Sequence, residues 1–191
     1  VDAQSLRAVA QGLGEAPLHI HVAEQTREVD DCLQHLGQRP VQWLLDQIGL
    51  DARWNLVHAT HTQAEELAGI AQAGASVVLC PSTEANLGDG LFDLPTALSH
   101  GVNWSIGTDS HVNRHPALEL QWLEYGQRLQ LRQRNLAARH GQRESTAAVL
   151  FEGALRGGSA ASGQALAGFR VGQRADLLAL DTASAPLLGL P

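Results

Sequence analysis

Four short apolar runs, each followed by histidine or carboxylate residues, constrain the fold more than any other feature of the chain. The runs begin near Leu18, Leu56, Val77 and Asn103, and segments with a helical pattern separate them. Strands that alternate with helices predict an α/β fold with a parallel sheet. Four such strands amount to half of a (β/α)8 barrel, which needs eight strands to close. A small doubly wound domain is the alternative.

The segments around these strands carry apolar residues at helical spacing. We expect helices over residues 2–14, 26–36, 40–48, 62–73, 95–100, 117–135 and 145–156. Thr62 and Glu65 are predicted to form a capping box for the helix that follows them. Gly157 and Gly158 are predicted to end the last helix. The polar stretch 81–90 is predicted to be a loop.

Composition narrows the class of protein. The chain has 191 residues, 44% of them hydrophobic, which suits a soluble globular enzyme. Its net charge of −7 argues against nucleic acid or an anionic membrane as the main partner. No apolar run approaches the ~20 residues of a membrane helix. Two cysteines imply no disulfide framework, so we expect a cytoplasmic protein.

Two features suggest that the chain is a piece of a longer one. It contains no methionine, and it ends on the apolar residues 185–191. Residues 163–181 have closely spaced glycines and then a short apolar strand pattern, which predicts the start of a separate small β-structure. We therefore divide the chain into a main unit, 1–160, and a partial β-domain, 161–191.

Polar residues of the kind that bind metals close each predicted strand. In chain order these are His19, His21 and Glu24; His58 and His61; Cys80 and Glu84; and Asp109 and His111. The carboxyl ends of parallel strands meet at one edge of the sheet, so these groups are expected to converge. Imidazole and carboxylate together suit Zn²⁺ or another divalent first-row metal.

Each of these residues, taken alone, has a purely structural explanation. His21 could be a core histidine, Glu24 a carboxylate at a helix N-terminus, and Asp109 a helix cap. Cys80 lies in an apolar run and is expected to be an inert core residue. The joint occurrence of His, His and Asp at successive strand ends favours a metal site over these separate explanations.

The motifs at these positions resemble the amidohydrolase superfamily, in its cytosine/guanine-deaminase-like branch. They are His-Val-Ala-Glu at 21–24, Val-His-Ala-Thr-His at 57–61, Cys-Pro-Ser-Thr-Glu-Ala-Asn-Leu-Gly-Asp-Gly at 80–90 and Gly-Thr-Asp-Ser-His at 107–111. The 80–90 segment is similar to that of superfamily deiminases acting on N-formimino-L-glutamate. The resemblance implies the C-terminal half of the barrel, strands 5–8, followed at 172–177 by re-entry into a small β-sandwich domain.

The resemblance also implies roles for residues. His21 and Asp109 would be metal ligands, normally of zinc. Asp109 would accept a proton from the attacking water, Glu24 would carry a proton to the leaving nitrogen, and His58 would orient the water or stabilise the tetrahedral intermediate. Weaker candidates for substrate binding are Glu84, Asn86 and His111. The His-x-His ligand pair of the family has no match here, so the isolated chain is expected to be inactive.

The reaction implied is the hydrolysis of N-formimino-L-glutamate to N-formyl-L-glutamate and ammonia in histidine degradation, by a complete enzyme that could be a homodimer. One alternative is a guanine, cytosine or S-adenosylhomocysteine-type aminohydrolase with the same metal chemistry. An alternative of another class is a non-catalytic α/β domain that binds a metal or a protein.

Overall fold

The computed structural model describes residues 2–166, 168 and 171–184, and these form a parallel α/β structure. Its four strands are β1 (Leu18–Val22), β2 (Trp54–His58), β3 (Ser76–Leu79) and β4 (Asn103–Ile106). They lie in the order β1-β2-β3-β4, and every neighbouring pair is parallel. The predicted parallel sheet is therefore confirmed.

The winding of this sheet distinguishes a barrel segment from a doubly wound domain. Strands that follow one another in the sequence are neighbours in the sheet, and the order runs in one direction from β1 to β4 without reversing. A doubly wound sheet has a point at which the strand order reverses, and a β/α barrel has none. The order therefore matches part of a barrel.

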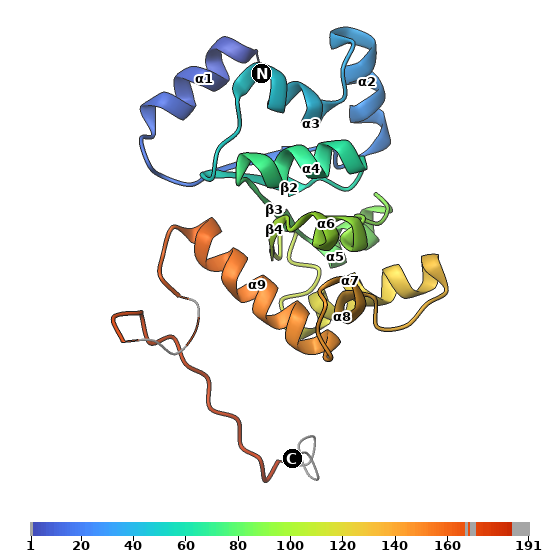
Figure 1. Ribbon diagram of the computed structural model, residues 1–191, viewed down its shortest axis with the longest axis vertical. Helices are drawn as coiled ribbons and strands as arrows, with labels where there is room; N and C mark the ends of the chain where they lie inside the picture. Colours follow the sequence, from blue (N-terminus) through green and yellow to red (C-terminus); the bar gives the residue numbers. More distant parts are fainter. Residues whose placement is uncertain (1, 167, 169–170, 185–191) are drawn as a thin grey trace.

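Helices connect and flank the strands, as Figure 1 shows. They are α1 (Ala3–Gly12), α2 (Thr26–Leu36), α3 (Pro40–Trp43) running into the π-helical turn η1 (Leu44–Ile48), α4 (Ala64–Ala73), α5 (Pro81–Leu87), α6 (Leu94–His100), α7 (Pro116–Leu131), α8 (Leu136–His140) and α9 (Thr146–Ser162). In Figure 1, α1 to α3 gather at one end of the molecule and α7 to α9 at the other.

The two faces of the sheet are covered differently. On one face Leu56, Val77 and Trp104 pack into the main core, with apolar residues from every helix but α5. On the other face Val57, Val78 and Cys80 form a small cluster, against which Ala161 of α9 packs. On β1 the exposed residues His19 and His21 alternate with Leu18, Ile20 and Val22, which pack in the main core. This second face corresponds to the inside of a barrel, and it is only partly covered.

Two helices occupy segments for which no helix was predicted. Residues 81–87 form α5 rather than part of a loop. Pro81 is at its first position, where a missing N–H costs nothing, and Gly88 ends it in the left-handed conformation. The short helix α8 starts where Glu124 of α7 accepts the N–H groups of Leu136 and Ala137. This long-range cap leaves no local pattern in the sequence.

The start of α4 also differs from the prediction. Gln63 is the N-cap, and Glu66, rather than Glu65, accepts the N–H of Gln63 at 2.8 Å. Thr62 instead donates its hydroxyl to the carbonyl oxygen of Ala59. The capping box is therefore shifted by one residue, because Glu66 is buried and also bonds to Arg39.

The last helix continues past the glycines that were expected to end it. Helix α9 runs to Ser162, through Gly153 and Gly157. A Cβ atom at Gly157 would lie 1.8 Å from the carbonyl oxygen of Trp104 on β4, and one at Gly153 would lie 2.6 Å from the Trp104 ring. These glycines allow the helix to approach the strand, so they serve packing rather than termination.

The predicted β-sandwich start is not found among the described residues of the tail. Residues 171–184 form turns and irregular backbone without a strand, and Figure 1 shows them leading away from α9. A strand needs a partner for its backbone hydrogen bonds, and the described part of the chain offers none here. Residues 167, 169–170 and 185–191 lie outside the described part. None of the described helices has the length and apolar character needed to cross a membrane.

Candidate functional site

Three predicted site residues meet at the carboxyl edge of the sheet. His21 lies on β1, His58 ends β2, and Asp109 follows β4. Each offers one donor atom, and these atoms all lie within 4.8 Å of one another. His58 is fully buried, whereas His21 and Asp109 are exposed. Residues far apart in the sequence therefore form a cluster that is open to solvent on one side.

The backbone at these strand ends adopts an unusual conformation. Ala23, His58, Ala59 and Asp109 have positive φ angles of 50°, 67°, 48° and 40°. Residues with a side chain seldom adopt the left-handed region, and such conformations are concentrated at functional sites. These turns bend the chain immediately after the strands, at the level where the donor atoms meet.

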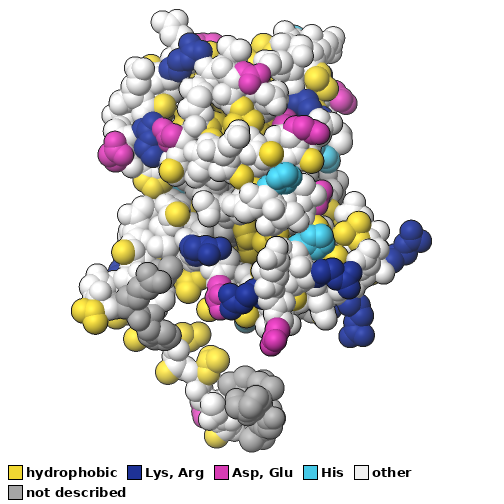
Figure 2. All heavy atoms as spheres, viewed as in Figure 1, with side chains coloured by type: hydrophobic (Ala, Val, Ile, Leu, Met, Phe, Trp, Pro, Cys, Tyr) yellow, Lys and Arg dark blue, Asp and Glu magenta, His cyan; other side chains and the backbone are white. Residues whose placement is uncertain are grey.

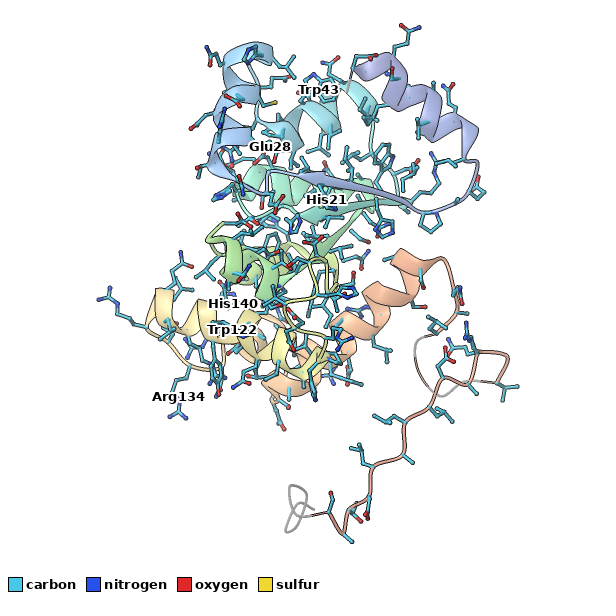
Figure 3. The ribbon with its side chains drawn as sticks, turned by 180° about the vertical axis from the view of Figure 1, so that it is seen from behind. His21, Glu28, Trp43, Trp122, Arg134 and His140 are labelled. Atoms are coloured by element: carbon cyan, nitrogen blue, oxygen red, sulfur yellow. The ribbon has the colours of Figure 1, made fainter. Side chains whose placement is uncertain are left out.

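Glu28 on α2 stabilises the first of these turns. Its two carboxylate oxygens accept the N–H groups of Ala23 at 2.8 Å and of Glu24 at 3.0 Å. Figure 3 labels Glu28 and, on the neighbouring strand, His21. The sequence interpretation missed Glu28. The only available signal was its place in the first turn of a helix that directly follows a predicted site strand.

His58 lies between two carboxylates. Its Nδ1 is 3.2 Å from Glu84 Oε1, and its Nε2 is 3.7 Å from Glu24 Oε1. Its ring meets that of His21 edge to face, with the ring centroids 5.1 Å apart. Nε2 is buried and has no hydrogen-bond partner within the part of the chain that the structure describes. This nitrogen is therefore available to a ligand.

These contacts also shift pKa values. Burial raises the pKa of Glu24; the positive charge of His58 opposes this, and the negative charge of Asp89 adds to it. For His58, burial lowers the pKa, but the hydrogen bond to Glu84 and the charges of Glu24 and Asp109 outweigh it, so the pKa is raised. The carboxyl of Glu24 therefore holds a proton more readily than usual, and so does the imidazole of His58.

The loop that carries Asp109 is anchored to α5. The hydroxyls of Thr83 and Ser110 lie 2.9 Å apart, and the Ser110 N–H donates to Thr83 Oγ1 at 3.3 Å. Buried Glu119 of α7 in turn accepts the N–H and the hydroxyl of Ser82. The sequence interpretation singled out none of Ser82, Thr83 and Glu119, because hydroxyl pairs and buried carboxylates on other elements have no fixed spacing.

The structure separates the three predicted substrate-binding residues. Glu84 is buried, and its Oε1 accepts the Cys80 N–H at 2.8 Å in addition to its contact with His58. Asn86 is exposed on α5, and His111 is exposed after Asp109 with a φ of 58°. Among the described residues, neither the Asn86 nor the His111 side chain forms a hydrogen bond. The contacts of Glu84 indicate a residue that orients His58.

An apolar pocket of about 530 Å³ lies between α5 and α7. Its lining includes Leu91, Phe92 and Trp122, and shares only Glu84 with the groups around His58. Trp122, labelled in Figure 3, belongs to α7 and lies away from His21. A hydrolytic site needs several converging polar groups, so we place the chemistry at the His21–His58–Asp109 cluster instead.

The donor set at that cluster fits a divalent metal. Imidazole and carboxylate are ligand types that zinc prefers, and His21 and Asp109 can supply one of each. Among the described residues His58 Nε2 has no hydrogen-bond partner, so it is available to a molecule bound at the cluster. On the face drawn in Figure 2, acidic and basic side chains are interspersed rather than gathered into a single positive patch.

Known proteins share both the sequence and the fold. Residues 5–190 match the amidohydrolase family. The chain is 49% identical over 178 residues to formimidoylglutamate deiminase of Pseudomonas aeruginosa, a match that covers 93% of this chain and 39% of that protein. The chain thus spans well under half the length of this curated relative.

Solved structures agree with this match. The crystal structure of an amidohydrolase from Brucella melitensis superposes with a TM-score of 0.82 and 49% identity, covering 85% of this chain and 36% of that one. The structure of an adenosine deaminase from Xanthomonas campestris with bound zinc gives a TM-score of 0.85 at 26% identity, covering all of this chain and 43% of that one.

Proposed function

This chain belongs to the amidohydrolase family, and on that premise we propose that the complete protein is a formimidoylglutamate deiminase. It would hydrolyse the amidine carbon–nitrogen bond of N-formimino-L-glutamate, with N-formyl-L-glutamate and ammonia as products. The observation that carries this proposal is the 49% identity to the Pseudomonas deiminase over 93% of the chain. Its substrate would be a small molecule, as the resemblance to the superfamily implies.

His21 and Asp109 would hold the metal, which we propose to be zinc. The donor types fit that ion, and the Xanthomonas relative contains zinc. When bound, the metal supplies Lewis acidity that lowers the pKa of a water molecule and polarises the substrate. This chain supplies two of the four ligands that the family pattern requires.

The remaining steps belong to side chains of this chain. The amidine reacts in its protonated form, and Asp109 accepts one proton of the attacking water while the water oxygen bonds to the amidine carbon. Glu24, whose pKa is raised, delivers a proton to the departing nitrogen. The carbon–nitrogen bond breaks to release ammonia, and the hydroxyl proton of the tetrahedral intermediate passes back to Glu24 as the carbonyl of the formyl group forms. Asp109 then returns its proton to solvent. His58 lies 3.7 Å from Glu24, and its free Nε2 orients the water and stabilises the tetrahedral intermediate.

Replacing Asp109 in the complete protein tests this function. Asp109→Ala is expected to lower kcat for ammonia release from N-formimino-L-glutamate by about 10²-fold or more, because a proton acceptor is lost, and to lower the bound metal content. Asp31→Ala, at an exposed position on α2, is the matched control and should change neither. A wild-type protein that releases no ammonia from this substrate would rule the proposal out.

A second candidate is deamination of an adenosine-type or other purine or pyrimidine base. The adenosine deaminase structure that covers the whole chain favours it, although the identity is lower. Measuring ammonia release from adenosine, S-adenosylhomocysteine, guanine and cytosine beside N-formimino-L-glutamate separates the two. A non-catalytic binding domain would show no turnover, and its metal content would be the same after Asp109→Ala.

A further inference from the structure

A second group of possible metal donors lies on the buried side of His58. It consists of His58, Cys80 and Glu84, whose donor atoms all lie within 4.8 Å of one another. All three side chains are buried, with exposed fractions of 0%, 2% and 4%. The group shares only His58 with the His21–His58–Asp109 cluster. It includes a thiol, which the proposed reaction does not use.

The spacing of these atoms approaches that of a tetrahedral metal site. Zinc binds nitrogen and oxygen ligands at about 2.1 Å, so two such ligands lie roughly 3.4 Å apart in a tetrahedral site. His58 Nδ1 and Glu84 Oε1 are already 3.2 Å apart. The sulfur of Cys80 lies within 4.8 Å of a ring nitrogen of His58 and of a carboxylate oxygen of Glu84, so a side-chain shift of about 1 Å would complete three ligands.

The ligand types select the kind of cation. A thiolate beside an imidazole suits zinc and softer ions, whereas magnesium and calcium require oxygen ligands. Burial and the neighbouring carboxylates of Glu84 and Asp109 raise the pKa of the Cys80 thiol to about 12. A bound cation must therefore displace the thiol proton to bulk water as the metal–sulfur bond forms. The group offers only three protein ligands, so we expect it to fill only when the cation is in excess.

We propose that His58, Cys80 and Glu84 form a second, inhibitory cation site that binds thiophilic divalent ions such as Cd²⁺ or excess Zn²⁺. Binding there takes up His58 Nδ1 and replaces its hydrogen bond to Glu84, which changes the orientation and proton affinity of the ring. His58 can then no longer orient the water. The inhibition rests on the proposed function, whereas cation binding at Cys80 does not.

Titration of the complete protein with CdCl₂ tests both parts. Binding is followed by the ultraviolet charge-transfer absorbance of a cadmium–thiolate bond, and inhibition by ammonia release. Wild-type protein should show the absorbance and lose activity over the same cadmium range. Cys80→Ala should lack the absorbance, keep its basal activity and need at least about tenfold more cadmium for inhibition. Cys32→Ala, which changes the other cysteine, should behave like wild type.

Several outcomes would overturn the proposal. They are an absorbance missing from wild type, one that persists in Cys80→Ala, or one that disappears from Cys32→Ala instead. Inhibition that is unchanged in Cys80→Ala would refute the inhibitory role. If Cys80→Ala does not fold, Cys80→Ser replaces it, because the hydroxyl keeps the size of the side chain and binds cadmium poorly. A protein inactive on N-formimino-L-glutamate but showing the Cys80-dependent absorbance would refute only the proposed function.

Discussion

His58 lies between two carboxylates of the candidate site, Glu24 and Glu84, which face opposite nitrogens of its ring. Glu84 accepts on the Nδ1 side and Glu24 lies on the Nε2 side. A fully buried imidazole between two carboxylates gains a proton more readily, which is why its pKa is raised despite burial. The protonation of this one ring therefore bears on stability and, under the proposed function, on catalysis.

The raised pKa of His58 predicts how stability depends on pH in the metal-free complete protein. The unfolded histidine has a pKa near 6.5. The stabilising contribution of the protonated ring is complete below that value, and it is lost as the pH rises through the higher folded pKa. Urea unfolding at a series of pH values should show a free energy of unfolding that falls above about pH 6.5.

His58→Gln should flatten this decline, because glutamine does not titrate. His100→Gln is the matched control, since His100 is exposed at the end of α6. Equal slopes in wild type and His58→Gln above pH 6.5 would show that His58 does not carry the effect.

Glu28 provides a second test at the scale of single residues. Its carboxylate accepts two backbone N–H groups at the end of β1. In Glu28→Ala those donors lose their partners, so we expect a loss of about 1–3 kcal/mol in the free energy of unfolding and a lower kcat. Glu65→Ala, at an exposed first-turn position of α4, should have little effect on either. Chemical denaturation and ammonia release measure both quantities.

The sequence predicted the meeting of His21, His58 and Asp109, because parallel strands bring their carboxyl ends to one edge. It did not predict the left-handed backbone at Ala23 or Asp109, because alanine does not favour that conformation and aspartate, although enriched in it, adopts it too seldom to predict it. The contact of Glu84 with His58 was also unpredictable in detail. The contact depends on helix α5, which occupies part of the segment 81–90. That segment was expected to be a loop because it is rich in polar residues and glycine.

At the scale of elements, α9 shows that close packing between elements can decide where a helix ends, against the local sequence pattern. Glycine pairs often end helices, but Gly157 continues one because its missing side chain admits the Trp104 carbonyl. Periodicity correctly placed most helices and all four strands. It failed for α5, α8 and the end of α9, where the deciding contacts come from distant residues such as Glu124 and Trp104.

Two neighbouring glycines of α9 offer a matched test of this packing. In Gly157→Ala the new Cβ atom would overlap the Trp104 carbonyl, so α9 must move, at a cost of about 1–3 kcal/mol. Gly158→Ala meets nothing within 4 Å and should be neutral, or stabilising by up to about 1 kcal/mol through helix propensity. Denaturant midpoints compare the two variants. Equal destabilisation would contradict the close approach.

At the scale of the whole molecule, the four strands form an open sheet with β1 and β4 at its edges. The face that carries His19 and His21 is only partly covered, and the chain spans 39% of the length of its deiminase relative. The overall α/β architecture followed from the alternation of apolar runs. The predicted β-sandwich start did not form among residues 171–184, because strand pairing there needs a partner beyond the local sequence.

The openness of the sheet leads to a prediction for the 191-residue chain produced alone. It should show no turnover of N-formimino-L-glutamate and no stoichiometric tight zinc, because it supplies only His21 and Asp109 of four expected ligands. Unpaired edges should also favour self-association. Metal analysis, ammonia release and size-exclusion chromatography test this, with the complete protein as the control. Stoichiometric zinc with measurable turnover would contradict it.

Gly153 and Gly157 also bear on how short motifs are interpreted. Their four-residue separation is the spacing by which membrane helices recognise one another, since small residues let two helical backbones touch. Here the partner is the backbone and ring of Trp104 on a strand, and none of the described helices could span a bilayer. The Gly-x-x-x-Gly spacing therefore indicates only that another segment packs closely against the helix, and that segment need not be a membrane helix. A search for membrane dimerisation motifs would select α9 for a contact made inside an enzyme fold.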